Sequence, residues 1–547
     1  MKLKSLPARS LVALLALFLL PVANLAQSVA APVSQVWVAD NGDGTYKNPI
    51  LHADYSDPDA IRVGDDFYMT ASSFNAAPGL PILHSKDLVN WRLISYVFTR
   101  QRPLDVFSRP QHGKGVWAPS IRYHAGEFYI YYPDPDFGIY LTKAKHPAGA
   151  WSEPLLIKEA KGWIDPCPLW DTDGNAYLVS AMAASRSGVK SILVVSRMSA
   201  DGTRLLDDGV MVFDGHDKHP TLEGPKFYKR NGYYYIFAPA GGVEHGWQLV
   251  LRSKNVYGPY EERVVLAQGK SAVNGPHQGA WVETQAGESW FIHFQDKGAY
   301  GRIVHLQPVR WTDDWPVMGI DADGDGTGEP VLTHPKPKVG GAWPVVTPPD
   351  SDEFDAPALG LQWQWHANPG THWAFPAPAL GFLRLFNVPL PEGHKNLWDV
   401  PSLLLQKFPA EQFTATTKLT FTPRTDEEAT GLLVMGLDYA YVSVKKRPAG
   451  LSVSQTIVKN AESGAQGKES LPLPLKTNTF YLRVEVSKNA VCRFSYSTDG
   501  AHFTTVGEPF NARQGRWIGA RLGLFALRTG HTRETGYADF DWFRVTK

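Results

Sequence analysis

One stretch near the N-terminus decides the fold of this chain, and it reads Tyr55-Ser56-Asp57-Pro58-Asp59-Ala60-Ile61-Arg62-Val63-Gly64-Asp65-Asp66-Phe67-Tyr68. An acid–proline step leads into an apolar strand, the chain turns at the glycine, and an aromatic strand returns. Two such strands around a glycine-containing turn are typical of a β-hairpin. The stretch therefore predicts one hairpin with a carboxylate at its entrance.

The same pattern recurs four more times, in residues 120–132, 169–179, 227–237 and 281–294. The five turn glycines, at positions 64, 126, 174, 232 and 287, lie 62, 48, 58 and 55 residues apart. Hairpins that repeat every 50 to 60 residues or so indicate a radial array with one sheet per blade. The sequence thus predicts an all-β fold that begins with a five-bladed β-propeller.

Each predicted blade has a distinctive residue at its entrance, within two positions of a proline: Asp57, Trp117, Asp165, Glu223 and His277. The innermost strand of every propeller blade starts beside the central axis, so equivalent positions in the five blades converge. We therefore expect three carboxylates, a tryptophan and a histidine to meet at one place.

Composition limits the domain number and the kinds of partner. The chain has 547 residues, which is too long for one ordinary domain, and 43% of them are hydrophobic, which is enough to form buried cores. Lysine plus arginine equals aspartate plus glutamate at 54 each, so the formal net charge is zero. A neutral chain without basic runs argues against nucleic acid or an anionic membrane as a partner.

The chain divides into four predicted segments. Residues 1–30 carry basic residues, then an apolar run and small residues, the layout of a signal peptide; we expect export to the periplasm or the medium. Residues 45–319 form the propeller, and residues 320–351, rich in proline and glycine, form a linker. Residues 352–547 contain strands in which apolar and polar residues alternate, but these strands lack the 55-residue period. This pattern favours a β-sandwich. Cys167 and Cys492 fall in different domains and are not expected to pair.

The three entrance carboxylates carry the chemistry. Any one of Asp57, Asp165 and Glu223 alone would be read as a turn cap. Three acids at one axis repel one another, and a fold keeps such a cluster mainly where it is used. Two carboxyl groups facing each other across a pocket are what glycoside hydrolysis requires, and a third raises the pKa of its neighbour so that it holds a proton.

The propeller resembles glycoside hydrolase family 43. The likeness rests on Ser56-Asp57-Pro58-Asp59, Val116-Trp117-Ala118-Pro119, Ile164-Asp165-Pro166 and Leu222-Glu223-Gly224-Pro225. The resemblance implies Asp57 as general base, Glu223 as general acid and Asp165 as the acid that modulates the pKa of Glu223. It also implies inversion at the anomeric carbon, for which the two carboxyls lie roughly 6.5 to 9.5 Å apart. Ser56 and the Cys167-Pro168 pair depart from the commonest family pattern without removing a catalytic group.

Weaker candidates surround the three acids. Trp117 is either a platform on which a sugar stacks or a core residue, and Phe74 is either pocket wall or core. Arg302 resembles an arginine that lines the sugar site in the family; the alternative is a salt bridge to one of the acids, and the two roles are compatible. His277 is either a hydrogen-bonded structural residue or a contact for a calcium ion or a water on the axis. No cofactor is expected for the chemistry, and a structural calcium is left open.

A second acidic stretch is a calcium-loop candidate. Asp321, Asp323 and Asp325 resemble the start of such a loop, but Leu332 occupies the position of the closing glutamate. A solvated turn is the better interpretation.

The C-terminal part resembles the concanavalin-like β-sandwich, a jelly-roll, that accompanies many β-xylosidases of the family. Asp352-Glu353-Phe354-Asp355, Trp363-Gln364-Trp365 and Asp539-Phe540-Asp541-Trp542-Phe543 carry this likeness. The resemblance implies that the sandwich packs on the propeller and lends a loop to the pocket rim.

The expected activity is exo-acting release of terminal pentoses from plant cell-wall fragments such as xylan, arabinoxylan, xyloglucan or arabinan. β-D-Xyloside is the leading substrate and α-L-arabinofuranoside is close behind. The rivals are an endo-acting arabinanase or xylanase and a non-catalytic carbohydrate-binding protein.

Overall fold

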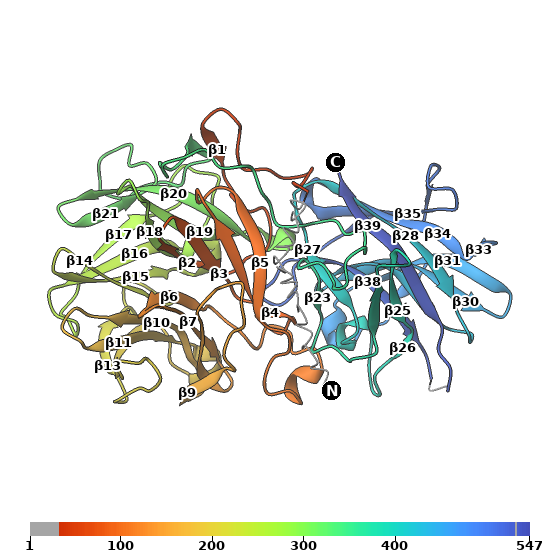
Figure 1. Cartoon of the computed structure of the whole chain (residues 1–547), viewed down its shortest axis with the longest axis horizontal. Coiled ribbons are helices and arrows are strands. Elements are labelled where there is room, and N and C mark those ends of the chain that lie inside the picture. Colours follow the sequence, from red (N-terminus) through yellow and green to blue (C-terminus); the bar gives the residue numbers. More distant parts are fainter. Residues whose placement is uncertain (1–31, 531–532) are drawn as a thin grey trace, which may run out of the picture.

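The computed structural model describes residues 32–530 and 533–547, and the predicted signal peptide lies outside this part. The chain forms two bodies side by side, a five-bladed β-propeller and a C-terminal β-sandwich (Figure 1). The predicted fold class is therefore confirmed.

Each blade is a four-stranded antiparallel sheet whose strands follow one another in chain order. The first two blades comprise β2 (Asp59–Val63), β3 (Asp66–Thr70), β4 (Gly79–Ser85) and β5 (Trp91–Phe98), then β6 (Ser120–His124), β7 (Glu127–Asp134), β8 (Gly138–Ala144) and β9 (Leu155–Glu159). The other three comprise β10 (Trp163–Trp170), β11 (Ala176–Met182), β12 (Ile192–Met198) and β13 (Val210–Asp214), β14 (Lys226–Arg230), β15 (Tyr233–Ala240), β16 (Trp247–Ser253) and β17 (Glu261–Leu266), and β18 (His277–Glu283), β19 (Ser289–Asp296), β20 (Arg302–Thr312) and β21 (Trp315–Met318).

The five predicted hairpins are the two innermost strands of each blade. Their turn glycines all adopt positive φ, between +62° at Gly64 and +86° at Gly126 and Gly174. Glycine reaches this left-handed region without the steric cost that a Cβ would add. The glycine period in the sequence therefore reports a backbone requirement that recurs once per blade.

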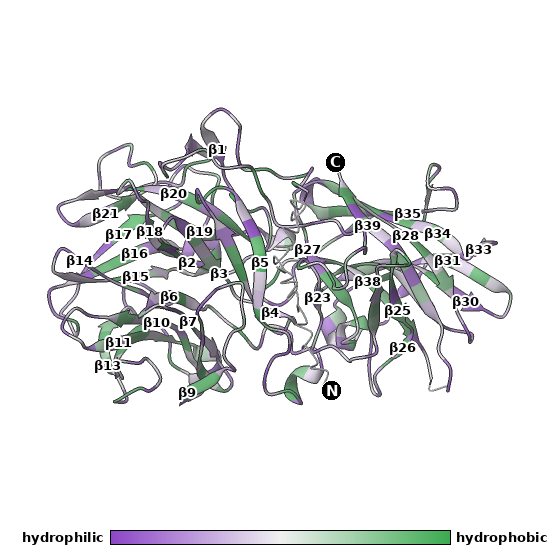
Figure 2. Cartoon of the chain, in the orientation of Figure 1, coloured by the Kyte–Doolittle hydropathy of each residue, from purple (hydrophilic) through white to green (hydrophobic). Residues whose placement is uncertain are grey.

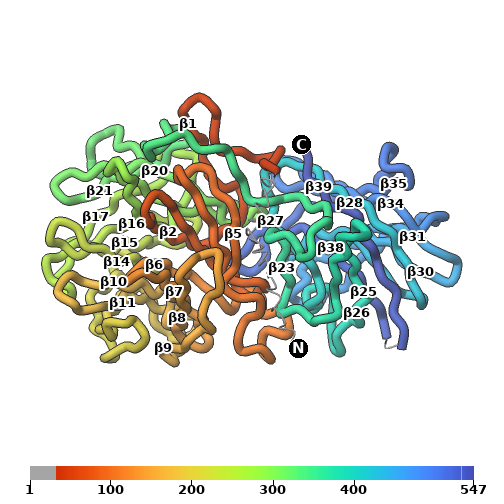
Figure 3. Tube along the Cα trace, viewed as in Figure 1, coloured from red at the N-terminus to blue at the C-terminus, as the bar shows by residue number. Residues whose placement is uncertain are grey.

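Segments from both ends of the propeller lie together beside the blades. β1 (Thr45–Lys47) pairs antiparallel with β22 (Thr333–Pro335), and Leu51 forms a bridge with Val304 in the fifth blade. The residues after β22 continue to the sandwich along the upper side of the view in Figure 3. The predicted linker thus contains a strand that pairs with the start of the propeller.

The sandwich consists of two sheets. The nine-stranded sheet contains β23 (Gln364–Trp365), β26 (Val388–Pro389), β27 (Leu404–Lys407), β29 (Ala429–Met435), β30 (Tyr439–Arg447), β31 (Gly450–Val458), β32 (Lys468–Glu469), β33 (Leu473–Leu475) and β38 (Arg521–Arg528). The eight-stranded sheet contains β24 (Ala374–Ala377), β25 (Phe382–Phe386), β28 (Phe413–Thr422), β34 (Thr479–Ser487), β35 (Val491–Ser497), β36 (Thr504–Thr505), β37 (Phe510–Asn511) and β39 (Tyr537–Thr546).

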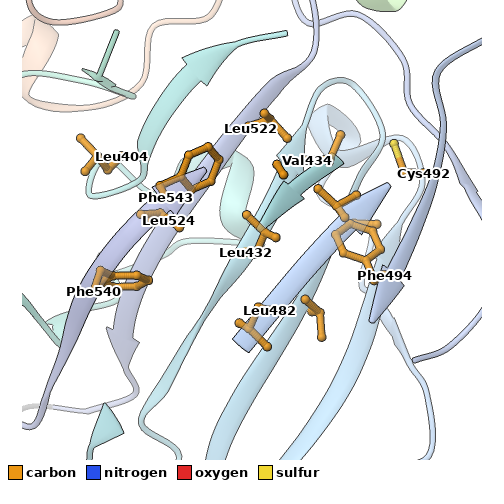
Figure 4. Packing of buried hydrophobic residues seen from close by; sticks show 14 of the residues in the cluster. Leu404, Leu432, Val434, Leu482, Cys492, Phe494, Leu522, Leu524, Phe540 and Phe543 are labelled. Atoms are coloured by element: carbon orange, nitrogen blue, oxygen red, sulfur yellow. The ribbon is translucent and has the colours of Figure 1, made fainter. Parts of the chain in front are cut away.

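The facing sides of these two sheets form the sandwich core. Leu432, Leu524, Leu482, Phe540 and Phe543 are fully buried and point toward one another from both sheets (Figure 4). Hydrophobic and hydrophilic residues are interspersed along the strands of both domains (Figure 2), as expected where one face of a strand is buried.

In the part of the chain that the structure describes, helical structure is limited to short turns. The α-helical turns are α1 (Ala184–Ser187) and α2 (Gly242–His245). The 3-10 turns are η1 (Val106–Ser108), η2 (Gly298–Tyr300), η3 (Leu397–Asp399), η4 (Ala461–Ser463) and η5 (Lys488–Ala490). Within residues 32–530 and 533–547, no helix has the length and apolar character needed to cross a bilayer.

The sandwich is joined to the propeller by backbone and side-chain hydrogen bonds. Ala77 after the first blade's second strand forms a bridge with Trp365 of β23. The amide of Asn75 donates to the carbonyl of His366 at 2.8 Å, and both residues are buried. These contacts place the sandwich beside the loops that surround the propeller axis.

Candidate active site

The five blade-entrance residues meet in one cavity. Asp57, Trp117, Asp165, Glu223 and His277 all line a cavity of about 410 Å³. The structure therefore brings together the residues that the repeat predicted would converge, although they span 220 positions of sequence.

Asp57 precedes β2 and is held by three donors. Its backbone adopts φ of +55°, a left-handed conformation that aspartate tolerates better than most residues. The hydroxyls of Ser56 and Ser72 donate to its carboxylate at 2.7 and 2.6 Å, and Arg302 contacts it at 3.1 Å. Asp57 is 6% exposed, so the orientation of its side chain is set by these neighbours.

Asp165 lies in a bulge of β10, where the pairing register shifts between Ile164 and Cys167. It also adopts a left-handed backbone, with φ of +57°. The N–H of Gly224 donates to its carboxylate at 2.7 Å and the amide of Gln278 donates at 3.4 Å. Burial raises the pKa of Asp165 above its ordinary value. The bond from Gly224 places Asp165 next to Glu223.

Glu223 precedes β14, and its N–H donates to the carbonyl of Pro239 at 3.1 Å. Burial, together with the charges of Asp165 and then Asp57, raises the pKa of Glu223 to about 8. Its side chain remains 26% exposed to the cavity. A carboxyl group with this pKa holds its proton near neutral pH and can donate it to a bound molecule.

The three candidates for contact with a sugar, Phe74, Trp117 and Arg302, also line the cavity. Phe74 is 3% exposed and its backbone pairs with Val116. Trp117 is partly exposed, and its indole N–H donates to the carbonyl of Gly113 at 2.8 Å. Arg302, at the start of β20, is 7% exposed and contacts Ser56 and Asp57 through one terminal nitrogen.

His277 is buried beside Glu223, with Nε2 3.5 Å from the Glu223 carboxyl. Its two ring nitrogens and the nearby Gln278 Oε1 have no hydrogen-bond partner. Burial and the charge of Arg302 lower the pKa of His277 to about 3, so the ring is neutral. Calcium takes six to eight oxygen ligands, and water molecules count among them. The calcium ion or water expected beside His277 therefore stays a prediction.

The acidic stretch of the predicted calcium-loop candidate lies after the fifth blade. The ligand atoms of Asp321, Asp323 and Asp325 lie within 4.8 Å of one another, and the last two residues are exposed. Asp321 accepts hydrogen bonds from the N–H groups of Gly324 and Gly326. These bonds fit the turn interpretation.

One cavity residue that sequence reasoning did not name comes from the sandwich. Trp517, in the loop before β38, lines the cavity, and its ring lies 6.4 Å from Trp117 and 5.6 Å from the Arg302 guanidinium. The resemblance implied a loop at the rim, but no local pattern identified this residue. Ser72 and Gln278, which bond to Asp57 and Asp165, were also missed.

The arrangement can perform acid–base chemistry on a neutral polar molecule. Glu223 holds a proton, while Asp57 accepts hydrogen bonds from two hydroxyls and contacts a guanidinium. Trp117, Phe74 and Trp517 supply aromatic surface, on which sugar rings stack.

Comparison with known proteins gives concordant matches for both domains. Residues 46–316 match the family described as glycosyl hydrolases family 43. Residues 351–546 match the beta xylosidase C-terminal Concanavalin A-like domain.

Several relatives extend over nearly the whole chain. A protein of Xylanibacter ruminicola, provisionally named a beta-xylosidase, is 43% identical over 505 residues and covers 90% of each chain. A Bacteroides ovatus non-reducing end alpha-L-arabinofuranosidase is 28% identical over 527 residues, 91% of this chain and 94% of that one. The crystal structure of xylan beta-1,4-xylosidase from Bacillus halodurans superposes with a TM-score of 0.81 at 27% identity, covering 92% of this chain and all of the other.

Proposed function

This chain belongs to glycosyl hydrolase family 43, and we propose that it is an exo-acting, inverting β-D-xylosidase that removes terminal xylose from cell-wall polysaccharide fragments. Relatives that are named beta-xylosidase and match over most of the chain support the substrate. The match to the beta xylosidase C-terminal domain supports it independently.

One observation carries the proposal: Asp57, Asp165 and Glu223 line one cavity, and the environment of each suits a different role. Glu223 is the general acid because its raised pKa keeps it protonated near neutral pH. Asp57 is the general base because two hydroxyl groups and the Arg302 guanidinium donate to its carboxyl oxygens and orient them. Asp165 is the modulating acid, since its charge raises the pKa of Glu223.

The reaction proceeds in one displacement. Asp57 takes a proton from a water molecule as the water oxygen attacks the anomeric carbon. The bond from that carbon to the leaving oxygen breaks, and the oxygen takes the proton of Glu223. The anomeric configuration inverts because water attacks the face opposite the leaving group.

Exo action is supported by the boundary of the cavity. Trp517 of the sandwich contributes to the same wall as Arg302, and Trp117 stands beside it. A cavity bounded by residues of both domains admits a chain end more easily than the middle of a polymer. An endo-acting enzyme needs an open cleft.

An α-L-arabinofuranosidase is the second candidate, because relatives of nearly full length are named arabinofuranosidase or xylosidase/arabinosidase. The two pentosides present similar hydroxyl groups to one cavity, and hydrogen bonds to single hydroxyls decide between them.

The test is release of 4-nitrophenol from the β-D-xylopyranoside and the α-L-arabinofuranoside by wild type, Asp57→Ala and Glu223→Ala. We expect preferential turnover of the xyloside, lost in the Asp57 variant and reduced in the Glu223 variant, with a larger loss on xylobiose than on the aryl glycoside. Proton NMR of the first sugar released from xylobiose should show α-xylose, the inverted product. Silence on both aryl glycosides, or full activity in either variant, would overturn the proposal.

Export is proposed from the sequence pattern of residues 1–30. Fractionation of cells that express the full chain should place the activity outside the cytoplasm. Activity that stays in the cytoplasm at full length would contradict this.

A further inference from the structure

We propose that Asp54 is a positioning residue that couples the docking of the β-sandwich to the shape of the active site. Asp54 lies three residues before Asp57 and is 4% exposed. One carboxylate oxygen accepts from the N–H of Arg302 at 2.9 Å, and the other accepts from the N–H of Gly519 at 3.1 Å. A single carboxylate thus holds one backbone segment from each domain.

The two segments approach so closely that glycine is required on both sides. Gly301 has φ of +75°, and a Cβ there would lie 2.5 Å from the Asp54 carboxyl carbon. A Cβ on Gly519 would lie 2.7 Å from the backbone nitrogen of Gly301. Beside them, the N–H of Ala520 donates to the carbonyl of Ala299 at 2.7 Å. The backbone of the propeller segment therefore packs directly on the backbone of the sandwich segment, and the Asp54 carboxylate accepts a hydrogen bond from each.

On the propeller side, Asp54 fixes the position of Arg302, which contacts the general base Asp57. The N–H of Tyr55 donates to the carbonyl of Arg302 at 3.1 Å, so residues 54 and 55 bond both backbone groups of Arg302. The guanidinium of Arg302 then reaches Ser56 and Asp57. The position of the base is thereby tied to the interdomain contact.

On the sandwich side, Asp54 fixes the loop that carries Trp517. This residue lies two positions before Gly519 and has φ of +63°, a strained conformation that its surroundings must maintain. Trp517 and Arg302 also line a second cavity of about 190 Å³, which includes Gln514 and Arg516. The loop therefore separates the two cavities, and releasing it would open the catalytic cavity toward the second.

Electrostatic attraction between Asp54 and Arg521 strengthens the contact between the two domains. Arg521 of β38 lies 3.8 Å from Asp54, and both side chains are 4% exposed. Arg521 also donates to Gln364 of the sandwich at 2.8 Å. Removing the charge of Asp54 would leave this buried guanidinium without its carboxylate, which is strongly unfavourable.

The inference rests on the proposed function, because the residues that Asp54 positions are those assigned to bind and hydrolyse a glycoside. It names a residue outside the catalytic cavity, and its effect has a structural readout that does not need activity.

The experiment uses the full chain with Asp54→Asn, Gly519→Ala, Trp517→Ala and the double variant Gly519→Ala/Trp517→Ala. Asp352→Asn is the control, since the Asp352 carboxylate accepts four hydrogen bonds within the sandwich. They come from the N–H groups of Phe354 and Gly360, the side-chain amide of Gln362 and the indole of Trp363. Steady-state kinetics on xylobiose and on 4-nitrophenyl xyloside are compared with hydrogen–deuterium exchange of residues 513–520.

We expect Asp54→Asn to lower kcat/KM on xylobiose about 10-fold, because small displacements of positioning groups are costly. Gly519→Ala should mainly raise KM, and should change kcat/KM less than about 2-fold when Trp517 is already alanine. Asp54→Asn should accelerate exchange in residues 513–520, whereas Asp352→Asn should not.

Three results would overturn the inference: kinetics of Asp54→Asn that match those of Asp352→Asn, a Gly519→Ala effect of equal size with and without Trp517, or unchanged exchange in residues 513–520. A wild type inactive on every pentoside would instead reject the proposed function, and the exchange experiment would still test the role of Asp54.

Discussion

Glu223→Gln should make the folded protein more stable at alkaline pH while removing the catalytic proton. The pKa of Glu223 is raised from 4.5 to about 8 by burial and by its acidic neighbours. Folding therefore raises its proton affinity. Below pH 4.5 the group is protonated in both states and contributes no pH dependence. Between pH 4.5 and about 8 the unfolded chain releases this proton while the folded chain retains it, so stability falls as the pH rises.

The size of this effect follows from the shift. Each pKa unit corresponds to about 1.4 kcal/mol, which sets an upper limit of about 5 kcal/mol for the loss between pH 4.5 and 8. Because 26% of the Glu223 side chain is exposed, we expect a smaller value, on the order of 2 to 3 kcal/mol. Glutamine removes this contribution.

The assay is urea unfolding of wild type and Glu223→Gln at pH 5 and pH 9. The difference in unfolding free energy between variant and wild type should shift by a few kcal/mol in favour of the variant at pH 9. Glu244→Gln is the matched control, because Glu244 on α2 is 80% exposed and its neighbours Gly242 and Val243 line the cavity. Parallel pH curves for Glu223→Gln and wild type would refute the assignment of Glu223 as a buried, protonated acid.

Kinetics provide a second check on Glu223. The wild-type kcat/KM should fall above about pH 8 as the acid loses its proton. In Glu223→Gln, turnover of xylobiose should drop by about 10² to 10⁴, a typical contribution of general acid catalysis. Turnover of 4-nitrophenyl xyloside should fall less, since nitrophenolate leaves without a proton. Equal losses on both substrates would argue against proton donation.

Three further predictions concern other parts of the molecule. Asp165→Asn should move the alkaline limb of the pH–rate profile to lower pH, because the charge of Asp165 helps to raise the pKa of Glu223; an unmoved limb would contradict this. Removing divalent metals with EDTA should leave kcat/KM unchanged, since Asp57 and Glu223, which line the cavity, supply both the base and the acid; activity restored by calcium would contradict this. Phe540→Ala, at a fully buried core position, should cost about 3 to 5 kcal/mol in urea unfolding, and a cost below about 1 kcal/mol would be inconsistent with the core.

The repeat and the three acids could be predicted from sequence because their signals are local. A turn such as that at Gly64 requires a residue with positive φ, and the corresponding turn of every blade has the same requirement. Asp57 and Asp165 each stand directly before a proline at a blade entrance, and Glu223 precedes one by two positions. Once the propeller is recognised, its symmetry alone brings these positions to one axis.

The contacts between the domains could not be predicted in this way. Asp54 and Gly519 are 465 residues apart, and no period links the sandwich to the propeller. Which residue of the sandwich loop reaches the cavity depends on how the surfaces of the two domains fit together. At Gly519 a Cβ would lie 2.7 Å from the backbone nitrogen of Gly301, which excludes a side chain there. The pKa of Glu223 likewise depends on burial that only the assembled cavity creates. Local backbone requirements and the symmetry of the blades therefore allowed the fold and the catalytic acids to be predicted from the sequence. The rim of the site and the electrostatics of its acids arise only when the two domains pack against each other.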